Sequence, residues 1–326
     1  MNIRFKKKAV LMTIAALLIS ALFFIMFSGE NILPVFYTSQ PLKTRVLSVD
    51  SYIKLIPVML SDALEVSTYK SLNGLYIYYS NIGTFPEEDV FYKNLVSCIK
   101  CGKLDCNYEV LCPYINGTDF ENIIINFKNL SDNHMNINTT ITINNILIEQ
   151  KYPFDIDVTA DVSYSVYDPV SNSRWERREN ITRIVSIIGL KDPLSGINTA
   201  GSYEITIKKS SICTTAFQNN APCWDINKVK SFYDERSFIY SPNATSFLSR
   251  YWNSTIQSEC CGIETFIHID DIRNVSYLDH YYFSGEHTCL EDTILSYGEI
   301  SPNFKLDSKT AGRYSISDEG VLICRR

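Results

Sequence analysis

Apolar and polar residues alternate with a period of two over residues 154–166, between Phe154 and Val166. Seven successive apolar positions match this period, and the residues between them are Asp, Thr or Ser. Successive side chains of a strand point to opposite faces, so the pattern predicts a strand with one buried face. Asp168-Pro169 predicts a turn directly after it.

Further strands are predicted by shorter patterns, at 122–128, 137–148, 181–188 and 203–208. With the strand at 154–166 they predict a sheet of about five strands, mostly antiparallel because the connections are short. In the last third, we expect strands near 263–269 and 275–283 and a short helix near 244–252.

Two segments show a helical period instead. Between 46 and 75, apolar residues recur at three- and four-residue steps, which predicts an amphipathic helix that could cover the sheet. Pro57 predicts a kink or two abutting helices, and Asn73-Gly74 predicts the end. A second helix is predicted over 87–100, where acidic residues open the segment.

Residues 9–27 form an apolar run with no charge, no Pro and no Gly. A helix of this length spans about 28 Å, close to the thickness of a bilayer core. Arg4 and Lys6 to Lys8 precede the run, so the positive-inside rule places the amino end in the cytoplasm and the body outside. A cleaved signal peptide is the alternative; its apolar region is usually shorter, and Met26-Phe27-Ser28 is a poor cleavage site.

The expected fold class is α+β, with a transmembrane helix and amphipathic helices packed on a mostly antiparallel β-sheet, and a disulfide-rich C-terminal region. The expected parts are a cytoplasmic tail (1–8), a transmembrane helix (9–28), an extracellular helical stalk (29–80), a Cys-rich segment (81–115), a β-sheet domain (116–210) and a disulfide-stapled region (211–326).

All ten cysteines follow residue 97, in three groups: Cys98, Cys101, Cys106, Cys112; Cys213, Cys223; and Cys260, Cys261, Cys289, Cys324. An even, clustered set on the outer side of a membrane predicts disulfides. Cys213 and Cys223 form the simplest pair. Cys260 and Cys261 are expected to bond to Cys289 and Cys324 rather than to each other, because the peptide between them is planar. A zinc site at Cys98–Cys112 is the alternative, but it lacks a second CxxC knuckle.

Glycosylation sequons, Asn-x-Ser/Thr, also fall entirely on the expected outer side, at Asn116, Asn129, Asn138, Asn180, Asn243, Asn253 and Asn274. They are candidate glycosylation sites, and the alternative is ordinary polar loops and strand edges.

Candidate chemistry is sparse. The four histidines, His134, His268, His280 and His287, lack the spacing of known metal sites, and no phosphate loop or nucleophile elbow occurs. Asp155, Asp157 and Asp161 lie too far apart along a strand for a calcium loop. A basic cluster is predicted around Trp175, from Arg174, Arg177, Arg178 and Arg183. The alternative is an exposed strand whose arginines form cross-strand ion pairs with those aspartates.

Composition narrows the functional classes. The chain of 326 residues is 45% hydrophobic and 20% charged, which excludes a disordered or collagen-like protein. Four of its 30 basic residues and none of its 36 acidic ones precede residue 29. The body is therefore acidic, which argues against nucleic-acid binding.

The amino-terminal segment KKKAVLMTIAALLISALFF resembles archaeal pilin-like or signal-anchored surface proteins. That resemblance implies processing at Ala9, with Val10 as the new first residue, and assembly through the apolar helix. Ala9 stands where the family has Gly, and Ile14 where it usually has Glu, so a permanent anchor is favoured. The blocks RWERRENITRIVSIIGLKDPL and CCGIETFIHI with SYLDHYYFS resemble archaeal membrane-anchored surface proteins.

We therefore expect a single-pass protein of the cell membrane with an extracellular body and a structural or adhesive role, of which a pilin-like subunit is one form. The alternatives are an extracellular ligand-binding module on a membrane stalk and an anchored surface enzyme. We expect no enzyme activity and no cofactor. The expected partners are the lipid bilayer, through residues 9–27, and other copies or other surface proteins.

Overall fold

The computed structural model describes residues 40–108, 110–216, 223–269, 273–285, 288–289 and 292–324. The chain divides into two units, Met1–Ser51 and Tyr52–Arg326. Within the described ranges, no helix is both long and apolar enough to cross a membrane. The predicted tail and transmembrane segment, residues 1–28, lie outside those ranges.

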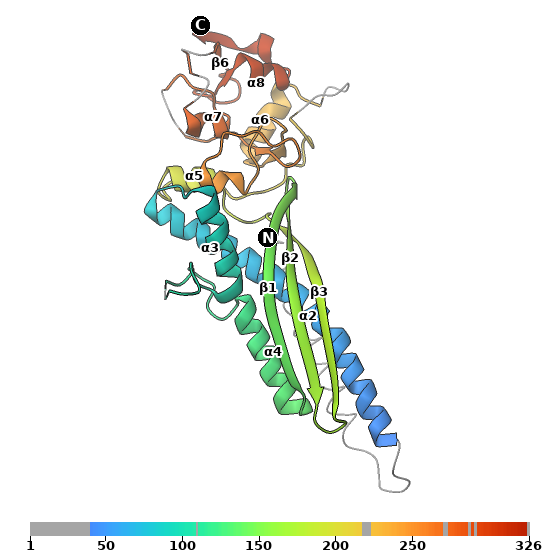
Figure 1. Cartoon of the computed structure of the whole chain (residues 1–326). Helices are drawn as coiled ribbons and strands as arrows, with labels where there is room; N and C mark the ends of the chain where they lie inside the picture. The colour runs from blue at the N-terminus through green and yellow to red at the C-terminus, as the bar shows by residue number, and fades with distance from the viewer. Residues whose placement is uncertain are drawn as a thin grey trace. The chain divides into compact units, whose positions relative to one another are not determined.

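The second unit contains a three-stranded antiparallel sheet in the order β1 (Asn138–Tyr152), β2 (Asp155–Asp168) and β3 (Ser173–Ser186) (Figure 1). The alternation predicted for β2 is confirmed, because every second side chain from Ile156 to Val166 is buried. Asp168 shapes the turn into β3, accepting hydrogen bonds from the Val170 amide (3.1 Å) and the Ser171 hydroxyl (2.7 Å). The predicted strand at 181–188 is thus the end of a longer strand that begins at Ser173.

Two helices cover the buried face of the sheet. α2 (Gln40–Ile82) is longer than predicted and has Pro57 inside it. Asn73-Gly74 does not end it. A side chain on Gly74 would overlap the carbonyl oxygen of Pro113, so this glycine serves close packing. The part of α2 within the second unit reaches β1 through Tyr52, whose hydroxyl lies 2.8 Å from that of Thr139.

α4 (Phe120–Met135) is the second covering helix, and it replaces the strand predicted at 122–128. The three β-branched isoleucines there favour a strand locally, but the ends of the segment decide otherwise. Asp119 caps the helix by accepting a hydrogen bond from the Asn122 amide (2.9 Å), and Asn136 ends it in a left-handed conformation. Phe127 then stacks on Tyr52 of α2, with ring centroids 5.4 Å apart.

α3 (Glu88–Cys101) confirms the helix predicted at 87–100. Gly102 follows with φ of 71°, and its amide hydrogen-bonds to the carbonyl of Cys98. Phe91 on this helix stacks on Tyr251, with ring centroids 4.5 Å apart, so α3 joins the sheet layer to the C-terminal region.

The C-terminal region has short elements around an aromatic core. Its helices are α5 (Pro193–Asn198), α6 (Ile226–Glu235), η1 (Ser249–Trp252), α7 (Asp279–Ser284), α8 (Ser308–Arg313) and η2 (Ser317–Glu319). Its strands are β4 (Ile239–Tyr240), β5 (Ile263–Glu264), β6 (Ile294–Ser296), β7 (Lys305–Asp307) and β8 (Val321–Cys324). The core contains Phe232, Phe266, Phe304 and Tyr314.

Several strand predictions are wrong in this region. Residues 203–208 form only an isolated bridge at Thr206. Residues 263–269 pair over β5 and through one further bridge, from Phe266 to Leu278. Residues 275–283 contain only the bridges at Val275 and Leu278 before α7 begins. The helix near 244–252 is limited to η1. These segments are held by packing around the aromatic core instead of by hydrogen bonds between paired strands. A local sequence pattern does not reveal such packing.

Five disulfides pair all ten cysteines: Cys98–Cys112, Cys101–Cys106, Cys213–Cys223, Cys260–Cys261 and Cys289–Cys324. The disulfides Cys98–Cys112 and Cys101–Cys106 use all four cysteines of the alternative zinc site, so that alternative is wrong. The bond between Cys260 and Cys261 corrects the expected pairing with Cys289 and Cys324. Cys324 lies opposite Ile294 in the β6–β8 pair, and its Cα atom is 5.7 Å from that of Cys289. Cys260 and Cys261 lie in a separate turn, in which the Ser258 amide donates a hydrogen bond to the Ala244 carbonyl.

Candidate functional site

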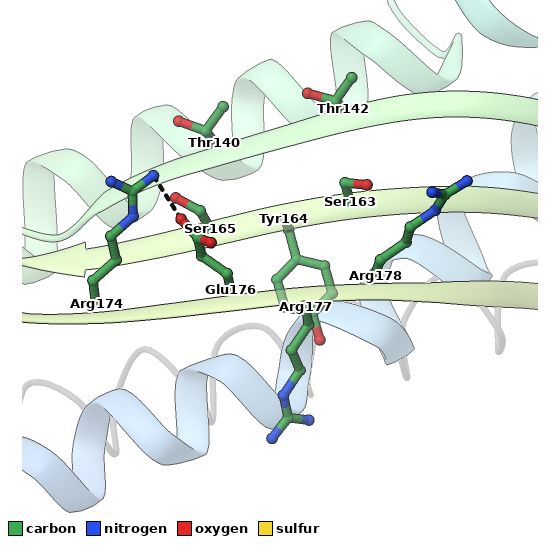
Figure 2. A pocket seen from close by; sticks show the side chains of 9 residues that line it. All are labelled: Thr140, Thr142, Ser163, Tyr164, Ser165, Arg174, Glu176, Arg177 and Arg178. Carbon is green, nitrogen blue, oxygen red and sulfur yellow. Dashed lines mark ion pairs between the residues drawn. The ribbon is translucent and has the colours of Figure 1, made fainter.

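The second face of the β1–β3 sheet is polar and accessible, and a groove of about 470 Å³ lies on it. Thr140 and Thr142 of β1 stand directly opposite Ser165 and Ser163 of β2. All four hydroxyls lie on one side of the sheet (Figure 2). The alternation that buries one face of β2 therefore also produces two short rows of hydroxyls on the other.

β3 adds charged side chains along the same groove (Figure 2). Arg174 forms an ion pair with Glu176 at 2.7 Å. Arg178 holds Asp161 of β2 through two hydrogen bonds, Nε to Oδ1 at 3.0 Å and Nη2 to Oδ2 at 2.6 Å. The hydrogen bonds from Arg178 lower the pKa of Asp161. The groove thus presents both signs of charge in fixed pairs. We call Thr140, Thr142, Ser163, Ser165, Arg174, Glu176 and Arg178 the polar sheet face.

The layer below the groove is held by Tyr164, Arg177 and Arg183. Tyr164 and Arg177 point to the opposite side from the hydroxyl rows (Figure 2). The Tyr164 hydroxyl donates to Glu179 at 2.6 Å, and burial together with this carboxylate raises the pKa of Tyr164 to about 12. Arg183 pairs with Glu65 of α2 at 2.5 Å. The polar sheet face therefore rests on a layer fixed to the helices.

The basic cluster expected around Trp175 is not one patch. Arg174 and Arg178 lie on the polar sheet face, whereas Arg177 and Arg183 belong to the helix-covered side. The two-residue period of a strand separates neighbours that look clustered in the sequence. The alternative of cross-strand pairing with the acidic row is confirmed for Arg178 and Asp161.

The other candidate residues are dispersed. Asp157 pairs with Lys151, His268 stacks on Tyr233, and His280 contacts Asp279. His287 lies outside the described ranges, and His134 lies in the last turn of α4. In the part of the chain that the structure describes, no group of three or more His, Cys, Asp or Glu residues could hold a metal ion.

The seven sequon asparagines fall into two groups. Those with exposed side chains are Asn116, Asn129, Asn138, Asn180 and Asn274. Asn243 and Asn253 are half-buried, and both line a second, smaller pocket in the C-terminal region. Exposed asparagines are accessible to a glycosylating enzyme, and the half-buried pair is less so.

Sequence reasoning missed a fully buried ionic cluster around Arg250. Its Nη1 contacts Asp279 Oδ2 at 2.6 Å and Asp192 Oδ1 at 3.0 Å, and all three side chains are inaccessible to solvent. Its Nη2 donates to the Ile263 carbonyl. The only local signal was an arginine among apolar and aromatic residues in SFLSRYW, and its partners are 58 and 29 residues away.

Comparison of the chain with protein-family models, with curated proteins and with solved structures finds no match. The functional argument therefore depends on the residues of the sites themselves.

Proposed function

We propose that this is a surface protein, anchored by residues 9–27, whose extracellular body has an adhesive role through the polar sheet face. One observation carries the proposal: the central strand β2 buries every side chain on one side of the sheet, and the other side of the sheet is polar and accessible. Arg174, Glu176 and Arg178 keep about two thirds of their side-chain area exposed. A rigid polar surface of this kind suits contact with another macromolecule.

The cysteines support the location. Five disulfides with no cysteine left over are typical of a chain that folds in an oxidising compartment. This agrees with the topology expected from the basic residues before the apolar run and its uncharged interior.

The chemistry of the polar sheet face indicates its partner. Hydroxyls both donate and accept hydrogen bonds, and fixed pairs of opposite charge match a protein surface that also carries both signs. We propose another surface protein, or another copy of this chain, as that partner. Single contacts of this polar kind are weak, and many copies on one surface would strengthen them by avidity.

A charge-reversal experiment tests this role. Arg174→Glu with Arg178→Glu, on cells that display the full chain, should abolish clumping between cells, because the polar sheet face then carries only negative charge and no longer matches a partner with both signs. Lys93→Glu with Lys309→Glu is the matched control. These lysines are also exposed and each forms one ion pair, with Asp105 at 3.2 Å and Asp292 at 3.4 Å.

The two double variants should be displayed equally and unfold at the same temperature. Clumping that survives the arginine reversal, or that is lost equally with the lysine reversal, contradicts adhesion through the polar sheet face.

The pilin-like alternative depends on processing at the amino terminus. N-terminal sequencing of the mature protein separates the two forms. A start at Val10 would support assembly through the apolar helix, and an intact tail with Lys6 to Lys8 would support a permanent anchor.

A further inference from the structure

A second pocket in the C-terminal region is lined by residues of α5 and α7 and by residues just before and just after η1. Of its ten lining residues only Leu194 is apolar, and none is Asp, Glu, Lys or Arg. The polar groups include three side-chain amides, two threonine hydroxyls and one imidazole, from Asn243, Asn253, Gln257, Thr245, Thr255 and His280.

His280 gives the pocket an oriented acceptor. Its Nδ1 lies 3.2 Å from Asp279 Oδ1. Burial alone would raise the pKa of Asp279, but Arg250 and His280 outweigh burial and lower this pKa below its usual value. An ionised carboxylate only accepts hydrogen bonds, so in the neutral form of the imidazole Nδ1 carries the hydrogen and Nε2 is an acceptor. This Nε2 is buried and has no hydrogen-bond partner among the residues that the structure describes. The side chain as a whole is 10% exposed.

The cluster around Arg250 fixes the geometry of this pocket. Arg250 belongs to η1, Asp279 begins α7, and Asp192 caps α5 by accepting a hydrogen bond from the Ser195 amide at 2.9 Å. One buried guanidinium therefore joins α5 and α7, which line the pocket, to η1, which Asn253 of the pocket directly follows. The polar groups are held in place before any ligand arrives, which lowers the cost of binding.

We propose that this pocket binds the hydroxyl-bearing edge of a neutral sugar. Amide and hydroxyl groups can each donate and accept, as sugar hydroxyls require, and a sugar hydroxyl can donate to His280 Nε2. A charged ligand would lose its hydration without meeting an opposite charge on the lining residues. The enclosed space of about 40 Å³ admits one edge of a pyranose ring, with the rest of the ring outside.

This site is separate from the polar sheet face, so each proposal can fail without the other. Methyl glycosides of glucose, mannose and galactose, and a mannotriose, are the probes for binding to the full chain, measured by saturation-transfer NMR and titration. Methyl glucuronide is the anionic control. We expect millimolar binding of at least one neutral glycoside and none of the glucuronide. Tighter binding of mannotriose would identify the end of a glycan chain as the source, and equal binding would identify a free sugar.

Variants locate the site. His280→Leu should weaken binding about tenfold through the loss of one buried acceptor. His268→Leu, which replaces a half-buried histidine elsewhere in the region, should leave binding unchanged. Gln257→Ala, at an exposed position on the pocket rim, gives an independent test if His280→Leu fails to fold, and should also reduce binding several-fold.

Three results would overturn the proposal. The first is no binding of any neutral glycoside at about 10 mM, a concentration at which a site with a Kd of about 1 mM is mostly occupied. The second is binding that His280→Leu and Gln257→Ala leave intact. The third is a glycan attached at Asn243 or Asn253, found by mass spectrometry of the native protein, because it would fill the pocket itself.

Discussion

Replacing Arg250 with Met tests how the C-terminal region is held together. The guanidinium is inaccessible to solvent and contacts two inaccessible carboxylates, Asp192 and Asp279. Met fills similar volume but leaves both carboxylates buried without their cation. Removing one partner of a buried ionic cluster costs about 3–5 kcal/mol of unfolding free energy. That amount is a large share of the stability of a typical domain.

Chemical denaturation of the full-length protein measures the change. Arg178→Met is the matched control, since Arg178 holds Asp161 with two hydrogen bonds but lies on the exposed face of the sheet. We expect its unfolding midpoint to stay close to that of the wild type, because water screens an exposed pair. Similar midpoints for Arg250→Met and Arg178→Met would refute the role given to the buried cluster.

The same variant has a characteristic dependence on pH. Arg250 lowers the pKa of both Asp192 and Asp279, whereas burial raises them. Without Arg250, burial should therefore raise the pKa of each carboxyl above its value in the unfolded chain. The folded variant then binds protons more tightly than the unfolded chain, so its stability rises as pH falls through those raised pKa values. The deficit of Arg250→Met should therefore be larger at pH 7 than at pH 5. A deficit that stays constant would contradict burial of the unpaired carboxylates.

Two further predictions concern disulfides and one histidine. Replacing Cys289 and Cys324 with Ser should cost about 4 kcal/mol and replacing Cys101 and Cys106 about 2 kcal/mol, because the loops closed span 35 and 5 residues; equal losses in denaturation would contradict this. Burial, with a smaller effect of nearby positive charge, lowers the pKa of His268 to about 4. Stability should therefore fall by about 1–2 kcal/mol, after discounting for screening, as pH drops from 6.5 to 4. His268→Gln should remove that slope, and an unchanged slope would assign it to other groups.

Sequence patterns were sufficient where local and tertiary preferences agree. The alternation in β2 and the acidic start of α3 predicted both elements close to their bounds. They failed where local preference and packing conflict. The isoleucines of α4 favour a strand, but the cap at Asp119 and packing of Phe127 on Tyr52 make the segment a helix.

The candidate sites were only partly accessible from the sequence. Strand alternation implies that Ser163 and Ser165 share an accessible face, but their partners on β1 depend on the register. The pocket beside His280 could not be predicted, because its groups come from four separate segments. Likewise, the Arg250 cluster joins residues far apart in the chain, and no periodic pattern marks such a contact.

The side of the membrane on which the body lies is the most direct test of the account. Intact cells are treated with a membrane-impermeant, lysine-reactive reagent, and the labelled peptides are mapped by mass spectrometry before and after lysis. Lys93 and Lys309 are 70% and 75% exposed on the body, and Lys6 to Lys8 lie in the basic tail. We predict that Lys93 and Lys309 are labelled on intact cells and that the tail lysines are labelled only after lysis. Labelling of Lys93 and Lys309 only after lysis would contradict the proposal of an extracellular surface protein.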